Sequence, residues 1–477
     1  MDGGAPASLW ARAKALFTRE PECEPQVEPQ VEPEAPHEAV FRDALALHQQ
    51  GRLPEAEQRY REVLSAQSGH APALAFLGML AYQAGRPAIA VDLLSRAVAI
   101  DPGQPGFHSN LALALNAAGR GRHALEACER AIGLDSKSVE AWSNRGIALW
   151  GLGRREEALA SFASALAIDP GHAQTHWNEG FLRMQLGLFE AGWQKQEWRW
   201  KLDHTLADRR EFPARLWLGQ ESLDGKTILL HAEQGLGDTI QFCRYAKLVA
   251  ARGAKVILEV QKPLIGLLSK VEGASEVLAR GEPLPSFDFH TPLLSLPLAF
   301  GTTLETIPAK RAYLECEPQE VASWRERLGE RIAPRVGLVW KAAGAHKSIA
   351  LERLLELATP GKEFFSLQNE VSAEEQTRLD SGGVRQLTAG LRNFSDAPLV
   401  DLMDLVITVD TSLAHLAAAL GKPVWMLLPY NPEWRWLLER EDSPWYPTMR
   451  LFRQPAVDDW DSVLERVKAE LAKSGPR

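Results

Sequence analysis

A stretch near the carboxyl end of the chain places polar side chains where an apolar strand gives way to a helix. Asp410, Thr411 and Ser412 follow the strand, and His415 comes three residues later. Free backbone N–H groups and hydroxyls at such a turn can hold a phosphate at the positive end of the helix. His415 lies one turn inside, on the same side as Thr411 and Ser412. An equally weighted interpretation makes His415 a buried side chain that bonds a backbone carbonyl.

A second loop, His231-Ala-Glu-Gln-Gly-Leu-Gly-Asp238, ends a predicted strand and opens a helix. Gly235 and Gly237 permit a sharp turn and the close approach of a ligand, and the helix start favours anions. The pattern lacks the third glycine of a dinucleotide-binding loop and the lysine of a P-loop. Asp238 is either a helix cap, which local sequence favours, or a carboxylate that projects into a cleft. Glu233 is the next candidate carboxylate in this loop.

Two further segments follow predicted strands. The loop after Arg335–Trp340 carries Lys341, His346 and Lys347, and basic residues at the carboxyl end of a parallel strand are where an open α/β sheet binds anions. The segment 428–450 is dense in Trp, Tyr and Arg, which suits stacking on a flat ring and pairing with charge. A tryptophan-rich contact between domains explains that composition equally well.

The elements that position these segments begin at about residue 213, where strands and helices alternate. Short apolar runs followed by turns or helices are typical of buried parallel strands. The predicted strands are Lys226–His231, Lys255–Val260, Phe287–His290, Arg335–Trp340, Glu363–Leu367, Val384–Leu387, Asp404–Val409 and Pro423–Leu428. Thr239–Ala251 is predicted to be a helix. Two successive sets, with a join near 315–334, predict two doubly wound domains facing a cleft, at 206–322 and 323–477.

Residues 37–205 repeat with a period of 34. The period is marked by Gly51, Gly85, Gly119, Gly153 and Gly187, with a small residue seven positions before and five positions after each one. Small residues let paired helices approach, and the glycine ends the first helix of each pair. The period resembles the tetratricopeptide repeat, a helix–turn–helix unit. It predicts an α solenoid of four full repeats and an atypical fifth, with a concave face suited to a peptide or protein segment.

The fifth repeat ends in three tryptophans, Trp193, Trp198 and Trp200. We interpret them as the cap of the solenoid packing on the region that follows, and an aromatic carbohydrate-binding patch is the alternative. At the other end, residues 1–36 are predicted to be a disordered tail, because 20–36 alternate Pro with acidic or amide residues. Helical spacing from Leu9 to Phe17 leaves open a short docking helix.

Composition narrows the class of protein. The chain has 477 residues, 45% of them hydrophobic and 24% charged, and a net charge of −9. The hydrophobic and charged fractions are those of an ordinary globular protein. The net negative charge disfavours binding to nucleic acid through phosphate neutralisation. Four cysteines lie too far apart for a zinc or redox pair. With no apolar run of membrane-spanning length and no signal-peptide pattern, we expect a cytoplasmic protein without a transmembrane segment.

In combination, three segments resemble the heptosyltransferase-type glycosyltransferases of family nine, which have the GT-B architecture. They are DLVITVDTSLAHLAAALGKPVW (404–425), GLGD (235–238) and VGLVW (336–340). Together with the repeats, about residues 40–475 are similar to bacterial glycosyltransferases with tetratricopeptide repeats, including those that modify flagellin. Ser412 departs from the family motif, which usually has Gly after Asp-Thr.

The resemblance implies roles for particular residues. Asp238 would be the general base near the acceptor hydroxyl, in an acceptor-side loop with Glu233, Gly235 and Gly237. The donor's phosphates would be held by Asp410, Thr411, Ser412 and His415. The basic loop with Lys341, His346 and Lys347 would offset the charge of the leaving group in place of a metal. Trp340 and Gln368 complete the predicted donor-binding set. No DxD element is evident, so we expect no metal ion and no cofactor besides the nucleotide sugar.

The sequence therefore predicts a GT-B protein O-glycosyltransferase. It would move a sugar from a nucleotide-sugar donor to Ser or Thr of a protein acceptor presented by the repeats. A flagellin-like acceptor and a CMP-linked nonulosonate donor are what the resemblance implies. Two alternatives stay open: a transferase of surface-polysaccharide or lipopolysaccharide synthesis, and a non-catalytic repeat scaffold with a decayed transferase domain.

Overall fold

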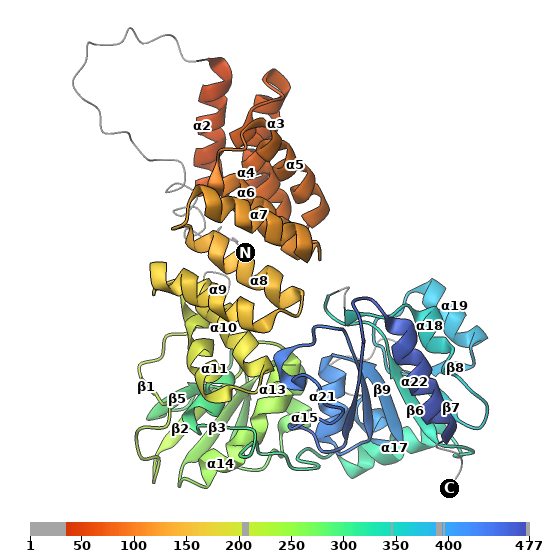
Figure 1. The fold of residues 1–477 in the computed structure, drawn as a ribbon. Coiled ribbons are helices and arrows are strands. Elements are labelled where there is room, and N and C mark those ends of the chain that lie inside the picture. Colours follow the sequence, from red (N-terminus) through yellow and green to blue (C-terminus); the bar gives the residue numbers. More distant parts are fainter. Residues whose placement is uncertain (1–34, 203–208, 345–346, 388–393, 395, 474–477) are drawn as a thin grey trace, which may run out of the picture. The chain divides into compact units, whose positions relative to one another are not determined.

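The computed structural model describes residues 35–202, 209–344, 347–387, 394 and 396–473 (Figure 1). The chain forms two compact units, one of residues 1–182 and 195–207 and the other of residues 183–194 and 208–477. The proposed docking helix near Leu9–Phe17 and nearly all of the tail lie outside the described residues.

The first unit is built from paired helices. They are α2 (Pro36–Gln49), α3 (Leu53–Ala66), α4 (Ala71–Gln83), α5 (Pro87–Ile100), α6 (Pro105–Ala117), α7 (Gly121–Leu134), α8 (Val139–Gly151), α9 (Arg155–Ile168) and α10 (Ala173–Gln185). Gly51, Gly85, Gly119 and Gly153 follow the first helix of each pair with φ of 69–76°, a conformation that glycine adopts without a Cβ clash. A Cβ at Gly146 would lie 2.4 Å from the Phe162 ring. The predicted repeat fold is confirmed, and so is its reason, the close approach of paired helices.

Residues 183–194 of the fifth repeat belong to the second unit. In α11 (Phe189–Gln196), Trp193 is 2% exposed, its ring lies 5.2 Å from that of Trp434, and its indole N–H donates to the Thr302 carbonyl at 2.8 Å. Gln185 donates to the Pro432 carbonyl at 2.8 Å. Trp193 therefore packs on the region that follows, as predicted.

Trp198 and Trp200 contact other residues than Trp193 does. Trp198 stacks on His176 with ring centroids 3.8 Å apart, and Arg199 lies over the Trp200 ring. Both contacts are inside the first unit, so the three tryptophans do not form one patch.

The second unit contains a five-stranded parallel sheet. Its strands are β1 (Arg215–Leu216), β2 (Thr227–His231), β3 (Lys255–Val260), β4 (Ala274–Ala279) and β5 (Phe289–Pro292), in the order β1-β5-β2-β3-β4. The helices among them are α13 (Leu236–Phe242), α14 (Ala246–Ala250), α15 (Ile265–Leu268) and α16 (Leu296–Ala299). The prediction of one helix at Thr239–Ala251 was wrong in detail, because the helix begins at Leu236 and a 3₁₀ turn at Cys243–Tyr245 interrupts it.

A six-stranded parallel sheet follows, after α17 (Pro318–Leu328). Its strands are β6 (Arg335–Val339), β7 (Glu363–Ser366), β8 (Val384–Gln386), β9 (Leu405–Val409), β10 (Val424–Leu428) and β11 (Met449–Arg453), in the order β11-β10-β9-β6-β7-β8. The connecting helices are α18 (Leu351–Leu355), α19 (Ala373–Ser381), α20 (Ala397–Asp401), α21 (Ser412–Ala419) and α22 (Trp460–Lys473). Two successive parallel α/β sheets agree with the predicted GT-B architecture. Within the described residues, no helix combines the length and the apolar character needed to cross a membrane.

The packing of Trp193 makes a prediction about fragments of the chain. A fragment spanning 183–477 should melt at a higher temperature than one spanning 208–477, because the shorter fragment loses Phe189 and Trp193 from an aromatic cluster. Trp193→Ala in the longer fragment should remove most of this difference, since truncating a buried Trp costs about 3–5 kcal/mol. Equal melting temperatures for all three proteins would contradict the assignment of 183–194 to the second unit.

Candidate functional site

The predicted site residues follow the carboxyl ends of strands in both sheets of the second unit. Asp238 comes after β2, Lys341 after β6, Gln368 after β7 and Asp410 after β9. The loop after β10 contributes a segment that was not in the predicted set, Glu433–Trp436. In open α/β sheets this edge is where ligands bind.

The start of α21 is capped by the side chain of the residue just before it. Thr411 is the N-cap, and its hydroxyl accepts from the Ala414 N–H at 3.4 Å. Asp410, just before it, receives the Lys347 ammonium at 2.8 Å. Burial opposes ionisation of Asp410, but Lys347 and the other positive charges near it, Arg435 among them, lower the pKa of this carboxyl. The structure thus brings together Lys347, Asp410, Thr411 and Ser412, with the lysine already paired.

His415 is buried one turn further along α21. Its Nδ1 lies 2.7 Å from the Tyr446 hydroxyl, and its ring lies 5.5 Å from that of Trp436. Burial, helped by the nearby Arg435, lowers the pKa of His415 to about 3. The imidazole is therefore neutral at physiological pH, and it can offer a ligand a hydrogen bond but no charge. His415 is thus buried, as the alternative interpretation proposed, but its partner is the Tyr446 hydroxyl and not a backbone carbonyl.

The glycine loop brings α13 against α21. A Cβ at Gly237 would lie 2.9 Å from His415 Cδ2 and 3.3 Å from Ser412 Cα. Gly235 is the N-cap of α13 and has extended backbone, φ −66° and ψ 164°. At Gly237 the missing side chain allows the contact between the two helices, whereas the sequence interpretation attributed the glycine to a sharp turn and the close approach of a ligand.

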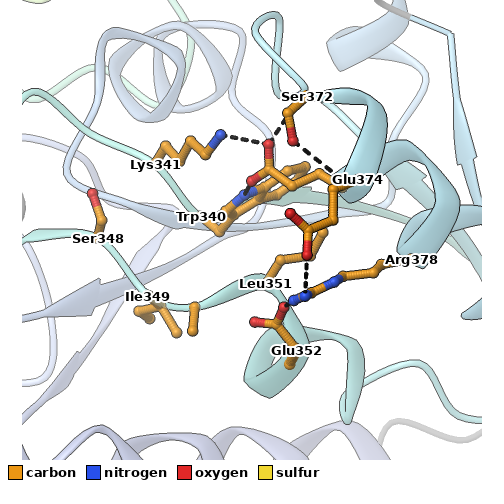
Figure 2. Close-up of a pocket in the computed structure, with 11 residues that line it drawn as sticks. Trp340, Lys341, Ser348, Ile349, Leu351, Glu352, Ser372, Glu374 and Arg378 are labelled. Atoms are coloured by element: carbon orange, nitrogen blue, oxygen red, sulfur yellow. Dashed lines mark hydrogen bonds and ion pairs between the residues drawn. The ribbon is translucent and has the colours of Figure 1, made fainter.

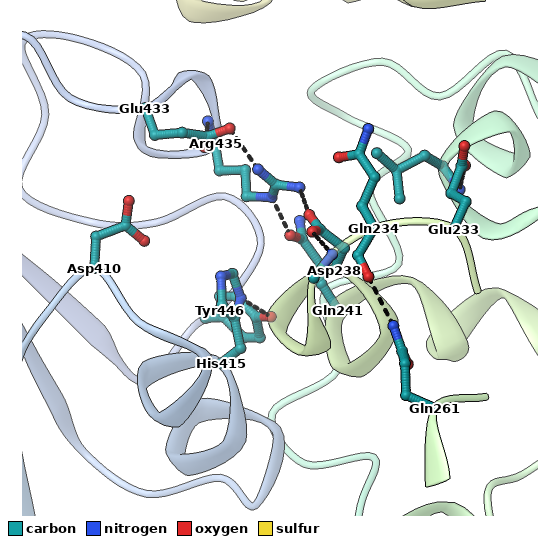
Figure 3. A network of polar contacts seen from close by, with 12 residues as sticks. Glu233, Gln234, Asp238, Gln241, Gln261, Asp410, His415, Glu433, Arg435 and Tyr446 are labelled. Atoms are coloured by element: carbon teal, nitrogen blue, oxygen red, sulfur yellow. Dashed lines mark hydrogen bonds and ion pairs between the residues drawn. The ribbon is translucent and has the colours of Figure 1, made fainter. Parts of the chain in front are cut away.

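Asp238 makes one contact at the start of its own helix and another with the loop after β10. It is the third residue of α13, not its N-cap, and its Oδ2 accepts from the Gly235 N–H at 3.0 Å. Its Oδ1 accepts from Nη2 of Arg435. Figure 3 shows the Arg435 guanidinium between the carboxylates of Asp238 and Glu433. The carboxylate both closes the helix start and takes part in a polar network.

Arg435 is the centre of that network and is 7% exposed. Its Nε donates to the Gln241 side-chain carbonyl, its Nη1 to Glu433 and its Nη2 to Asp238. Glu433 also accepts from the Arg435 backbone N–H at 3.0 Å. Burial raises the pKa of Glu433 to about 7 against the pull of Arg435, and the charge of Asp410 adds to the rise.

A pocket of about 450 Å³ opens between the end of β6, the segment 348–352 and α19. Figure 2 shows Trp340, Lys341 and Ser372 on one side and Arg378 between Glu352 and Glu374 on the other. Trp340 is 1% exposed, and its indole N–H and the Lys341 ammonium both bind Glu375. Burial opposes ionisation of Glu375, yet these contacts hold its pKa at about 2. Lys341 is thus engaged away from Asp410.

The remaining predicted residues are placed as follows. Gln368 is half-buried, and its side-chain oxygen accepts from the Lys341 N–H at 3.0 Å. Glu233 is 3% exposed and accepts from the Leu294 N–H at 3.1 Å, which makes it a poor second candidate for a base. His346 lies outside the described residues. No described residues form a group of His, Cys, Asp or Glu that could hold a metal ion, and metal-independent chemistry stays a prediction.

Sequence reasoning missed Glu433, Arg435, Gln241 and Tyr446 as members of this site. The signal was the density of Trp, Tyr and Arg in 428–450. The rings of Trp434, Trp436, Trp445 and Tyr446 are buried, so the segment serves a packed contact with Arg435 inside it. Nothing in the sequence distinguishes Arg435 from other arginines of this segment.

Comparisons with known proteins identify both regions. Models described as tetratricopeptide repeat match residues 47–114, 105–130 and 139–172, and the model described as glycosyltransferase family 9 (heptosyltransferase) matches residues 387–436. The chain therefore combines tetratricopeptide repeats with a family 9 glycosyltransferase region. The matched segment contains Asp410, His415, Glu433 and Arg435.

One curated relative is Protein FlbA of Caulobacter vibrioides, 30% identical over 323 residues, which cover 60% of this chain and 53% of that protein. The chain thus spans about half the length of this relative. Among solved structures, MamA is 20% identical with a TM-score of 0.29, covering 35% of this chain and 97% of that chain. YrrB, described as a TPR protein with an unusual peptide-binding site, is 25% identical with a TM-score of 0.29, covering 35% and 88%. These TM-scores are too low to support an inference.

The helix contact at Gly237 yields a stability prediction. An alanine in a helix usually stabilises it by about 0.5–1 kcal/mol relative to glycine, but Gly237→Ala should cost about 1–3 kcal/mol because its Cβ would push against His415. Gly266→Ala, in α15 with open space at the Cβ position, is the matched control and should be neutral or stabilising. Denaturant unfolding of both variants measures the difference, and equal effects would show that α13 and α21 do not touch here.

Proposed function

We propose that the chain is a metal-independent glycosyltransferase that uses a nucleotide-sugar donor. The observation that carries the proposal is that α13, which holds Asp238, packs against the start of α21: a Cβ at Gly237 would lie 3.3 Å from Ser412 Cα. Arg435, which binds Asp238, also feels the charge of Asp410 just before α21 (Figure 3). A transferase needs a base beside the acceptor hydroxyl and a stabilised phosphate leaving group, and these two elements offer one each.

In this mechanism the acceptor oxygen attacks the anomeric carbon of the donor while the bond from that carbon to the phosphate oxygen breaks. The hydroxyl proton goes to the carboxylate of Asp238. The phosphate gains negative charge at the N-terminus of α21, where backbone N–H groups, Lys347 and the neutral His415 can bond it. Arg435 holds Asp238 in orientation throughout.

The proposed acceptor is a Ser or Thr hydroxyl of a protein segment held by the repeats, in the cytoplasm. The repeats support a protein acceptor because solenoids of this kind offer an extended concave surface. A flagellin-like acceptor and a CMP-linked nonulosonate donor are the particular forms that the resemblance favours.

The test is incubation of the full chain with UDP-, GDP-, ADP- and CMP-linked sugars. Release of nucleotide from one donor, together with a matching mass increase on a candidate flagellin, is the expected result. Nucleotide release with transfer only to a lipid-linked glycan would favour the polysaccharide alternative. Absence of both release and binding across the panel would favour the scaffold alternative.

The phosphate site predicts a loss of nucleotide affinity when its cation is removed. Lys347→Met should weaken binding of the nucleotide product about tenfold or more, since a charge-assisted bond contributes about 1.5–3 kcal/mol. Lys422→Met is the matched control: Lys422 is 22% exposed against 24% for Lys347 and is also paired, with Asp401 at 3.2 Å. It precedes β10 and so lies at the opposite edge of the sheet. Calorimetry that shows equal losses would remove Lys347 from the site.

The base assignment predicts the effect of Asp238→Asn. The amide keeps one acceptor oxygen, for Gly235 or for Arg435 but not for both, and it cannot take a proton, so turnover should fall by about 10²–10⁴-fold. A melting curve measured beside turnover at saturating donor distinguishes lost chemistry from lost structure. Normal turnover in a normally stable variant would assign the proton to another group.

A further inference from the structure

The guanidinium of Arg435 is shared between two carboxylates that come from different sheets. Nη2 binds Asp238 on α13, and Nη1 binds Glu433 in the loop after β10. The side chains of Asp238 and Glu433 are each 19% exposed, and that of Arg435 is 9% exposed. One mostly buried guanidinium is therefore paired with two carboxylates at once.

Around Glu433 negative charges outnumber positive ones. The charged groups that act on it are Arg435 beside it in the chain, Asp410 at the end of β9 and Lys347 after β6, with Asp238 across the guanidinium. With His415 neutral, three carboxylates oppose two cations, a net charge of −1. A phosphate that enters such a site is repelled unless one carboxylate gives up its charge.

We propose that Glu433 is the proton-carrying residue of the donor site. It shares Arg435 with Asp238 when the site is empty, and it takes up a proton when an anionic phosphate binds, which leaves Arg435 to Asp238 and the phosphate. Glu433 acts through Arg435 and is in this sense a positioning residue. The inference rests on the proposed donor site.

The buried position of Glu433 is consistent with this role. Its pKa of about 7 means that a proton is available to it near neutral pH at little cost. A bound anion adjacent to Asp410 would raise the pKa further, because like charges disfavour ionisation. Asp410 is less suited, since Lys347 lowers the pKa of that carboxyl.

The first experiment is proton-linked binding to the full chain. CMP, UDP, ADP and GDP are titrated calorimetrically between pH 6 and pH 9, in buffers of different ionisation enthalpy. Wild type should take up a proton on binding, and its affinity should fall by up to about tenfold per pH unit above neutral. Glu433→Gln, whose amide can still accept from Arg435, should lose that uptake. Glu439→Gln, at an exposed neighbour, should keep it.

The matched variants distinguish proton uptake by Glu433 from proton uptake by the nucleotide, because the phosphate of the nucleotide also titrates. Equal proton uptake in wild type and Glu433→Gln would overturn the proposal. Absence of nucleotide binding to every variant would instead contradict the proposed function, and the second experiment tests the sharing of Arg435 by Glu433 and Asp238 without any ligand.

The second experiment follows stability against pH. A carboxyl whose pKa is higher in the folded than in the unfolded chain binds more protons when folded, so stability falls as pH rises between about 4.5 and 7. Glu433→Gln should remove this fall in melting temperature. Asp238→Asn removes the carboxylate that competes for Arg435, so Arg435 should pair more fully with Glu433 and lower its pKa. The fall in stability should then occur at lower pH. An unchanged profile in both variants would show that Arg435 is not shared, and the proposal would be wrong.

Discussion

The burial of Arg435 is the constraint on which the arrangement of the second unit depends. A buried cation costs several kcal/mol unless it is paired and hydrogen-bonded, and the guanidinium has N–H groups in three directions. Gln241 and Asp238 on α13 satisfy two of them and Glu433 the third. Because α13 follows β2 of the first sheet and Glu433 follows β10 of the second, pairing this one arginine requires the loops of both sheets to lie together.

A second buried arginine strengthens the same contact. Arg244 donates to the Trp445 carbonyl at 2.7 Å, to the Tyr313 hydroxyl at 2.8 Å and to the Gln241 backbone carbonyl at 2.7 Å. Gln241 thus accepts from Arg244 with its backbone and from Arg435 with its side chain. Arg244 lies within the 3₁₀ turn that interrupts the predicted helix, so its side chain makes these bonds from that turn.

Much of the fold could be predicted from the sequence because its causes are local and repeated. The glycine period indicates a backbone conformation that glycine favours, and apolar runs such as Val336–Val339 indicate a strand that is buried on both faces of its sheet. β1, β4 and β11 were missed. β1 has two residues, β4 carries exposed Ser275 and Glu276, and the start of β11 was assigned to the aromatic-rich segment 428–450. Arg435 could not be found in this way, since its partner Asp238 lies 197 residues away. Only the fold selects that pair.

The loop that carries Glu433 and Arg435 is held from two sides, and this explains how so charged a segment keeps its geometry. Gln185 bonds the Pro432 carbonyl, and Trp193 packs on Trp434, so the end of the fifth repeat buttresses residues on either side of Glu433. Phe242 of α13 packs on Trp445. Precise placement of reacting groups depends on such support, because small displacements cost large factors in rate. Residues 183–194 of the last repeat are therefore part of the second unit, and a view of the repeats as a separable acceptor module does not apply to this segment.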